Sequence, residues 1–168
     1  MEQIQLIYQS VQDRMVLLIK TKTDEPITLW LTRRVTKLLL TELNQLTHKD
    51  QAVISQATPA NRQHVRQFQQ QTAADRSNFE KSKIDVKTLM KETPPQLVAD
   101  VKLGADKVLK MPMTDGKVLN LTVSTQLAYV VSNLINTALK QTDWQLSDKP
   151  TTSSIEYTHQ SYPTITLN

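Results

Sequence analysis

Apolar and polar residues alternate near the start of the chain, and this alternation predicts β-strands. The period of two is typical of a strand that buries one face and exposes the other. It occurs at residues 3–9 and again at residues 27–31, on either side of an apolar run at residues 15–19. A continuous apolar run predicts a central strand, since both of its faces would be covered. Three consecutive strands are therefore expected.

A helical pattern follows the third predicted strand. Between Arg33 and Leu46, apolar residues recur three and four positions apart, which is the stripe of a helix lying on a sheet. Thr32 stands just before this stripe and is a good N-cap, because its hydroxyl can accept a hydrogen bond from a free amide of the first turn. The first part of the chain thus predicts a strand–strand–strand–helix unit.

The same pattern returns 92 positions later without a gap. Residues 106–138 repeat the apolar positions of residues 14–46, and Ser124 stands where the first copy has Thr32. The paired apolar positions are Ile27 and Leu119, Leu29 and Leu121, Leu31 and Val123, Val35 and Leu127, Leu38 and Val130, Leu39 and Val131, and Leu43 and Ile135. A duplicated unit predicts a pseudo-symmetric domain with one shared core.

The second copy predicts its own strands and helix. Strands are expected at residues 97–101, 108–113 and 118–123, and a helix at residues 125–140. Asp115-Gly116 is the strongest hairpin signal in the chain, since this dipeptide suits a tight turn between antiparallel strands. The second helix is more apolar than the first, which predicts that it is buried on two sides.

The segment between the copies is polar and rich in glutamine. Thr58-Pro59 is typical of a helix start, and a helix from Pro59 to Lys83 would carry only Val65, Phe68 and Phe79 on its apolar face. Such a thin face predicts weak docking, or docking against a partner chain.

Together these patterns predict an α+β fold built by internal duplication of a βββα unit. The six strands would form one antiparallel sheet or a closed barrel-like arrangement, with two packed helices and a helical insertion between the repeats. A single domain is expected over residues 1–146, with repeat one at 3–47, the insertion at 48–94 and repeat two at 96–140. Residues 147–168 form a Ser/Thr/Pro-rich tail that predicts disorder or an edge strand.

The amino-acid composition indicates a cellular compartment and excludes some kinds of chemistry. The chain has 168 residues and no cysteine, which excludes disulfides, thiolate metal sites and cysteine nucleophiles. The first residues lack the basic and apolar regions of a signal peptide, and no apolar run approaches the roughly 20 residues of a spanning helix. A soluble cytoplasmic protein is expected, with no membrane contact.

No motif predicts catalysis. The two glycines, Gly104 and Gly116, both fall in predicted turns, whereas a loop that binds phosphate through backbone amides usually needs more. His48, His64 and His159 are far apart in the sequence, with no second ligand at a metal-binding spacing. We therefore expect no catalytic residues, no cofactor and no metal.

The net charge of +4 arises mostly between the copies, where residues 58–92 carry 7 basic and 4 acidic side chains. A second basic cluster lies at the start of the first helix, beside the strand that bears Trp30. Positive charge there opposes the helix dipole, so it indicates either anion binding or Arg stems that cover the sheet edge. The candidate residues for binding nucleic acid or an acidic partner are Trp30, Arg33, Arg34, Lys37, Arg62 and Arg66.

Three functions remain open on the sequence. The first is a non-catalytic binding or assembly module, a homodimer, that contacts protein through a sheet edge or the central helix. The second is a single-stranded DNA or RNA binder, since two repeated units of strands plus a helix resemble, in fold alone, the Whirly and Pur type of nucleic-acid-binding proteins. The third is an enzyme with a non-standard site.

Overall fold

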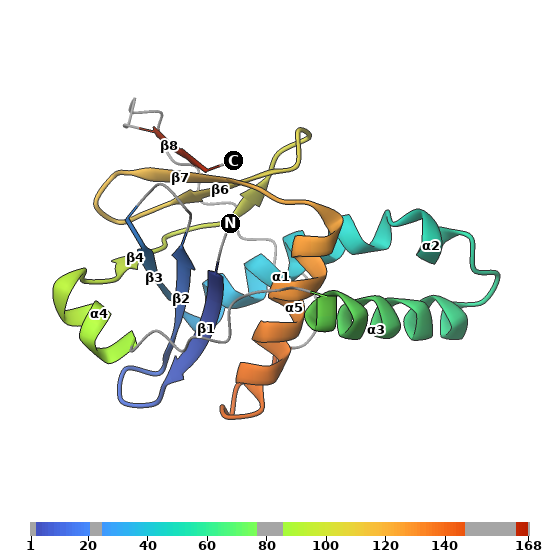
Figure 1. The fold of residues 1–168 in the computed structure, drawn as a ribbon, viewed down its shortest axis with the longest axis horizontal. Coiled ribbons are helices and arrows are strands. Elements are labelled where there is room, and N and C mark those ends of the chain that lie inside the picture. Colours follow the sequence, from blue (N-terminus) through green and yellow to red (C-terminus); the bar gives the residue numbers. More distant parts are fainter. Residues whose placement is uncertain (1–2, 21–24, 77–85, 147–163, 168) are drawn as a thin grey trace.

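The structure, a computed structural model, describes residues 3–20, 25–76, 86–146 and 164–167. It has an α+β fold with two separate sheets (Figure 1). The strands are β1 (Gln3–Gln9), β2 (Arg14–Lys20), β3 (Ile27–Leu31), β4 (Gln96–Leu97), β5 (Lys102–Leu103), β6 (Val108–Pro112), β7 (Val118–Thr122) and β8 (Thr164–Leu167). The helices are α1 (Arg33–His48), α2 (Gln51–Ile54), α3 (Pro59–Arg76), α4 (Val86–Glu92) and α5 (Thr125–Leu139).

Each sheet combines antiparallel and parallel pairs. The first has the order β1-β2-β3-β4, and the second has the order β5-β6-β7-β8. The last pair in each sheet, β3 with β4 and β7 with β8, is parallel. The other strand pairs in the described part of the chain are antiparallel. The predicted single antiparallel sheet was therefore wrong, and so was the closed barrel.

The two sheets are separate because residues 96–103 form hydrogen bonds first with one sheet and then with the other. A single strand was predicted at residues 97–101, but the segment bonds first to β3 and then to the end of β6. The Val98 amide donates to the Trp30 carbonyl at 3.1 Å, whereas the next amide, of Ala99, donates to the Pro112 carbonyl at 2.8 Å. After Val101 the chain pairs with β6 as β5. The expected strand is thus a connection between two sheets.

Local signals at the helix starts are confirmed. The Thr32 hydroxyl accepts from the Val35 amide at 3.3 Å, and the Ser124 hydroxyl accepts from the Leu127 amide at 3.1 Å. The Asp115-Gly116 hairpin is also confirmed, as the turn between antiparallel β6 and β7, where Gly116 has a φ of 90°. That conformation suits glycine because it has no Cβ to clash with the backbone.

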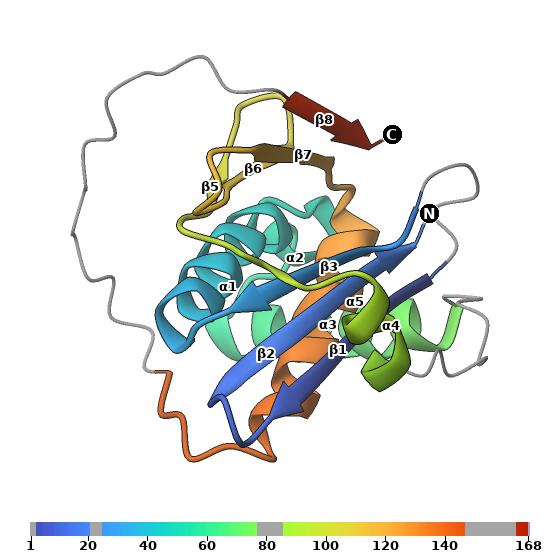
Figure 2. The ribbon, with the colours of Figure 1, turned by 90° about the vertical axis from the view of Figure 1, so that its left-hand side faces the viewer.

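The helices cover both faces of the first sheet. α1 and α5 pack on each other and on one face of this sheet, and α4 lies over the opposite face (Figures 1 and 2). Strand β2 is central, and its residues 15–19 are all buried, as the apolar run predicts. α5 contacts α1, α3 and β1, so its predicted burial on two sides is confirmed.

The central segment differs from its prediction. α3 begins at Pro59 as expected, with the Thr58 hydroxyl accepting from the Asn61 amide at 3.2 Å. Its predicted continuation to Lys83 and the apolar residue Phe79 lie outside the described residues. Two short helices, α2 and α4, were not predicted, because helices of one or two turns show too little periodicity to detect.

Candidate functional site

Trp30 lies on β3, on the face of the first sheet opposite α1 and α5. Its cross-strand partner is Val16, whereas the neighbouring Leu29 and Leu31 point into the core shared with α1. The indole is half-buried, and the guanidinium carbon of Arg14 lies 6.0 Å from the ring centroid. A cation at this distance is attracted to the ring face. Part of the expected stacking surface is therefore already in contact with Arg14.

Arg33 and Arg34 stand in the first turn of α1, and each bonds a backbone carbonyl from another segment. Arg33 donates to the carbonyl of Gln145, after α5, at 3.4 Å. Arg34 donates to the carbonyl of Ala99, in the connection between the sheets. Lys37 is half-buried one turn further along α1. The basic cluster therefore holds two neighbouring loops in place, and both arginines remain exposed at the surface.

Arg62 and Arg66 lie at the other end of α1. Arg62 donates to the Gln56 carbonyl at 2.9 Å, and the Arg66 guanidinium contacts the imidazole of His48, the last residue of α1. α1 has 16 residues, so its ends are roughly 24 Å apart at 1.5 Å per residue. The structure therefore does not bring these two arginines together with Trp30, Arg33 and Arg34.

A polar cluster that the sequence did not predict joins α5 to the start of α2. The hydroxyl of Tyr129, which is buried, donates to the Asp50 carboxylate at 2.8 Å. The other carboxylate oxygen accepts from the Ala52 amide at 3.1 Å. Burial raises the pKa of Tyr129, and the hydrogen bond and charge of Asp50 raise it further, while Arg66 lowers it. Tyr129 therefore stays protonated as a donor at neutral pH.

We expect Tyr129→Phe to lower the free energy of unfolding by about 1.5 to 3 kcal/mol, since it removes a hydrogen bond to a charged group. Chemical denaturation followed by circular dichroism measures the change. Tyr8→Phe is the matched control, because the Tyr8 hydroxyl also donates to an aspartate but at an exposed position. Equal losses for the two variants would contradict the buried role of Tyr129.

Asp13 organises a second polar cluster at the turn between β1 and β2. One carboxylate oxygen of Asp13 accepts from the Tyr8 hydroxyl and from the Trp144 indole N–H, both at 2.7 Å. The two rings also meet edge to face, with centroids 5.8 Å apart. The hydrogen bond to Asp13 raises the pKa of Tyr8. This cluster fastens the chain after α5 to the first hairpin.

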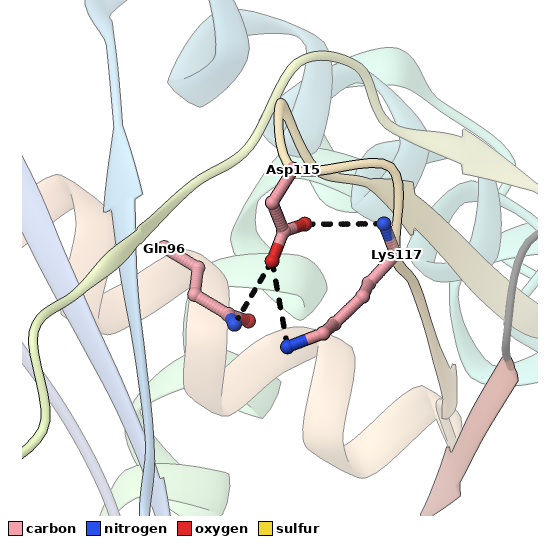
Figure 3. A network of polar contacts seen from close by, with 3 residues as sticks. All are labelled: Gln96, Asp115 and Lys117. Carbon is pink, nitrogen blue, oxygen red and sulfur yellow. Dashed lines mark hydrogen bonds and ion pairs between the residues drawn. The ribbon is translucent and has the colours of Figure 1, made fainter.

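A third cluster links the two sheets. Asp115, in the turn between β6 and β7, accepts from the Gln96 side chain of β4 at 3.3 Å and from the Lys117 amide at 3.1 Å (Figure 3). The Lys117 ammonium lies 3.5 Å from the same carboxylate. All three side chains are partly exposed, and an exposed ion pair adds little stability. The contribution of this cluster is to orient the turn against β4.

Glu42 connects α1 to the second sheet. Its carboxylate is half-buried and accepts from the Leu103 amide at 3.2 Å and from the Gln45 side chain at 3.1 Å. Burial raises the pKa of Glu42, the charge of Asp100 adds to this effect, and the Leu103 amide and Lys102 oppose it. The net direction is upward, so the folded chain holds this proton more tightly than the unfolded chain does.

Glu42 therefore contributes stability at low pH that is lost as the pH rises through its folded-state pKa. Relative to Glu42→Gln, the wild-type chain is expected to lose free energy of unfolding as the pH rises from the ordinary range of a glutamate, about pH 4, through the raised folded-state pKa of Glu42. Urea unfolding of both proteins at a series of pH values measures this difference. Parallel curves across the range would show that the carboxylate titrates alike in both states.

Two large apolar side chains are exposed on the paired helices α2 and α3. Phe68 of α3 is 68% exposed, and Ile54 of α2 is 51% exposed. The face of α3 that packs on α5 carries the buried Ala73, so Phe68 points away from that contact. In Figure 1, α2 and α3 extend to one side of the molecule, away from both sheets.

Neither the chemistry of the described residues nor the comparisons indicate a known activity. Among the residues that the structure describes, no group of three histidines, aspartates or glutamates is placed to hold a metal ion. In the same part of the chain, no helix combines the length and apolar character needed to cross a membrane. Comparison with protein-family models, with curated proteins and with solved structures finds no match to this chain.

Proposed function

We propose that this chain is a non-catalytic binding or assembly module that contacts protein through α3 or through a sheet edge. The observation that carries the proposal is the exposure of Phe68 on the outer side of α3. Aromatic side chains supply much of the binding energy at protein interfaces. Leaving one in water has no benefit for folding, since its apolar surface stays exposed.

The surroundings of Phe68 suit a protein partner. His64 lies one turn before it and Gln71 nearly one turn after it on the same side of α3, and both are exposed. The cores of protein interfaces are enriched in aromatic residues and depleted of charged ones, and their rims are polar. Ile54 adds a second apolar anchor on the neighbouring α2.

Affinity capture with matched variants tests the proposal. The full chain, Phe68→Ser and Val11→Ser are each used to capture proteins from cells that express the chain. Val11 is 90% exposed in the turn between β1 and β2, so its variant removes a comparable side chain elsewhere. We expect partners that the wild-type chain and Val11→Ser retain and that Phe68→Ser loses at least about tenfold. Identical captured sets for all three would overturn the role of α3.

A second candidate is single-stranded nucleic-acid binding around Trp30. The observation that favours it is the presence of Arg14 beside Trp30, together with Arg33 and Arg34 just after the end of β3. Phosphate contacts strengthen as salt falls, so titration of labelled single-stranded DNA and RNA at low salt tests this function. Absence of binding there rules it out, and binding that Arg33→Ala reduces supports it.

We also propose that the two halves arose by duplication of a βββα unit. In support, β2, β3 and α1 have counterparts in β6, β7 and α5, in the same order. Each third strand leads through a capping hydroxyl, Thr32 or Ser124, directly into its helix. Each third strand also has a parallel neighbour on its outer side.

A further inference from the structure

Strand β1 forms a long outer edge of the first sheet. It has seven residues and, among the strands of the described residues, pairs with β2 alone. Residues 5–9 are half-buried, whereas every residue from 15 to 19 of the neighbouring β2 is buried. Alternate residues of an edge strand direct their N–H and C=O groups away from the sheet. This edge therefore offers a row of backbone groups to another strand.

β1 lacks the features with which proteins normally protect an edge. Charged side chains, prolines and very short strands discourage pairing between edges, and β1 contains no charged residue and no proline. Two of the other described edges are protected. β4 and β5 have two residues each, Pro94-Pro95 precedes β4, and β5 carries Lys102. β8, the fourth edge, has only four residues.

The accessible part of β1 is complementary to itself. Gln3 and Ile4 are only 4% exposed, which leaves Gln5–Gln9, with the sequence Gln-Leu-Ile-Tyr-Gln. Two antiparallel copies centred on Ile7 would place each Gln5 opposite a Gln9 and each Leu6 opposite a Tyr8. A two-fold contact requires this kind of match, because one patch meets its own copy.

The faces of the strand also agree in this arrangement. Leu6 and Tyr8 share the core-facing side, since their cross-strand partners are Leu17 and Met15. Ile7 shares the opposite side with Val16, which is buried. An aromatic residue opposite an aliphatic one stabilises antiparallel pairs, and no like charges would meet.

We propose that a second copy of this chain pairs antiparallel with β1, centred on Ile7, so that the two first sheets form one continuous sheet. The inference rests on the proposed function, since it names the partner that the sheet edge receives. It needs no conformational change, because the strand is already extended.

Sedimentation velocity over about a hundredfold range of concentration tests the association. The wild-type chain is expected to shift from monomer to dimer, and Ile7→Lys is expected to weaken dimerisation at least about tenfold, because two lysines would face each other across the axis. Val11→Lys is the control, since it adds the same charge at the exposed turn beyond the strand. A wild-type chain that stays monomeric, or a dimer that Ile7→Lys leaves unchanged, would overturn the proposal.

Single cysteines test the register even if Ile7→Lys fails to fold. The chain has no cysteine, so each variant carries one thiol. Ile7→Cys is expected to form a disulfide-linked dimer on mild oxidation, since the two positions face each other within disulfide reach. Gln5→Cys and Gln9→Cys alone should not cross-link, but a mixture of the two should. Cross-linking of Gln5→Cys alone, or none by Ile7→Cys, would overturn this register.

The two proposals fail separately. A monomeric chain that still captures proteins through Phe68 would overturn pairing through β1 and leave the binding module in place. Partner capture that Phe68→Ser does not alter, in a chain that dimerises through β1, would overturn only the role of α3.

Discussion

Replacing Trp144 by alanine is expected to lower the free energy of unfolding by about 3 to 5 kcal/mol. The indole is only 6% exposed, so the change removes a large apolar side chain from the core. It also removes the hydrogen bond to Asp13 and the edge-to-face contact with Tyr8. The segment after α5 would then lose these two attachments to the first hairpin. Thermal and urea unfolding measure the loss.

Trp144→Phe separates the apolar burial of the indole from its hydrogen bond to Asp13. The phenyl ring retains most of the apolar contact but cannot donate to Asp13, which keeps its bond from Tyr8. A loss of about 1 to 2 kcal/mol is expected, in the range for one hydrogen bond and a small loss of volume. A Trp144→Ala loss under about 1 kcal/mol would mean that the segment after α5 contributes little to the fold.

Leu43→Ala and Ile135→Ala are each expected to cost about 2 to 5 kcal/mol. Leu43 on α1 and Ile135 on α5 are both 0% exposed. The two helices pack against each other, and α1 also contacts both sheets. A cavity at either position would therefore reduce contacts among several elements at once, since close-packed interiors relax only partly. Denaturation of each variant measures the cost.

An exposed position on α5 supplies the control. Asn136→Ala on α5 changes an exposed side chain next to Ile135 and is expected to alter stability by less than about 0.5 kcal/mol. Similar losses for Ile135→Ala and Asn136→Ala would contradict the described burial of α5. Leu43 and Ile135 hold corresponding positions of the recurring apolar pattern, 92 residues apart.

Local interactions explain the parts of the fold that could be predicted. A capping hydroxyl acts within three residues, so Thr32 and Ser124 could be recognised from the sequence. The hairpin at Asp115-Gly116 is local in the same way. The apolar run of β2 indicated a central strand because burial of both faces requires apolar residues on both faces. These signals depend on neighbours along the chain.

Long-range pairing explains the parts that could not be predicted. Residues 97–101 alternate like a strand, but their amides bond to β3 at one end and to the β6 end at the other. Alternation indicates which side chains are buried and carries no information on which strand supplies the hydrogen bonds. The same limit applies to Tyr129 and Asp50, which are 79 residues apart. No pattern in the sequence relates them.

The candidate binding residues illustrate both what the sequence predicts and what only the folded structure decides. The sequence alone determined strands β1, β2, β3, β6 and β7, the capping hydroxyls of α1 and α5, the basic cluster of Arg33 and Arg34, and the neutral composition of β1. Only the tertiary structure decided that both arginines bond backbone carbonyls of other segments, that Arg62 and Arg66 lie a helix length away, and that β1 is an outer edge. Periodicity can be read from residues close together in the sequence. The exposure of a side chain and its hydrogen-bond partners are fixed only when distant segments pack together.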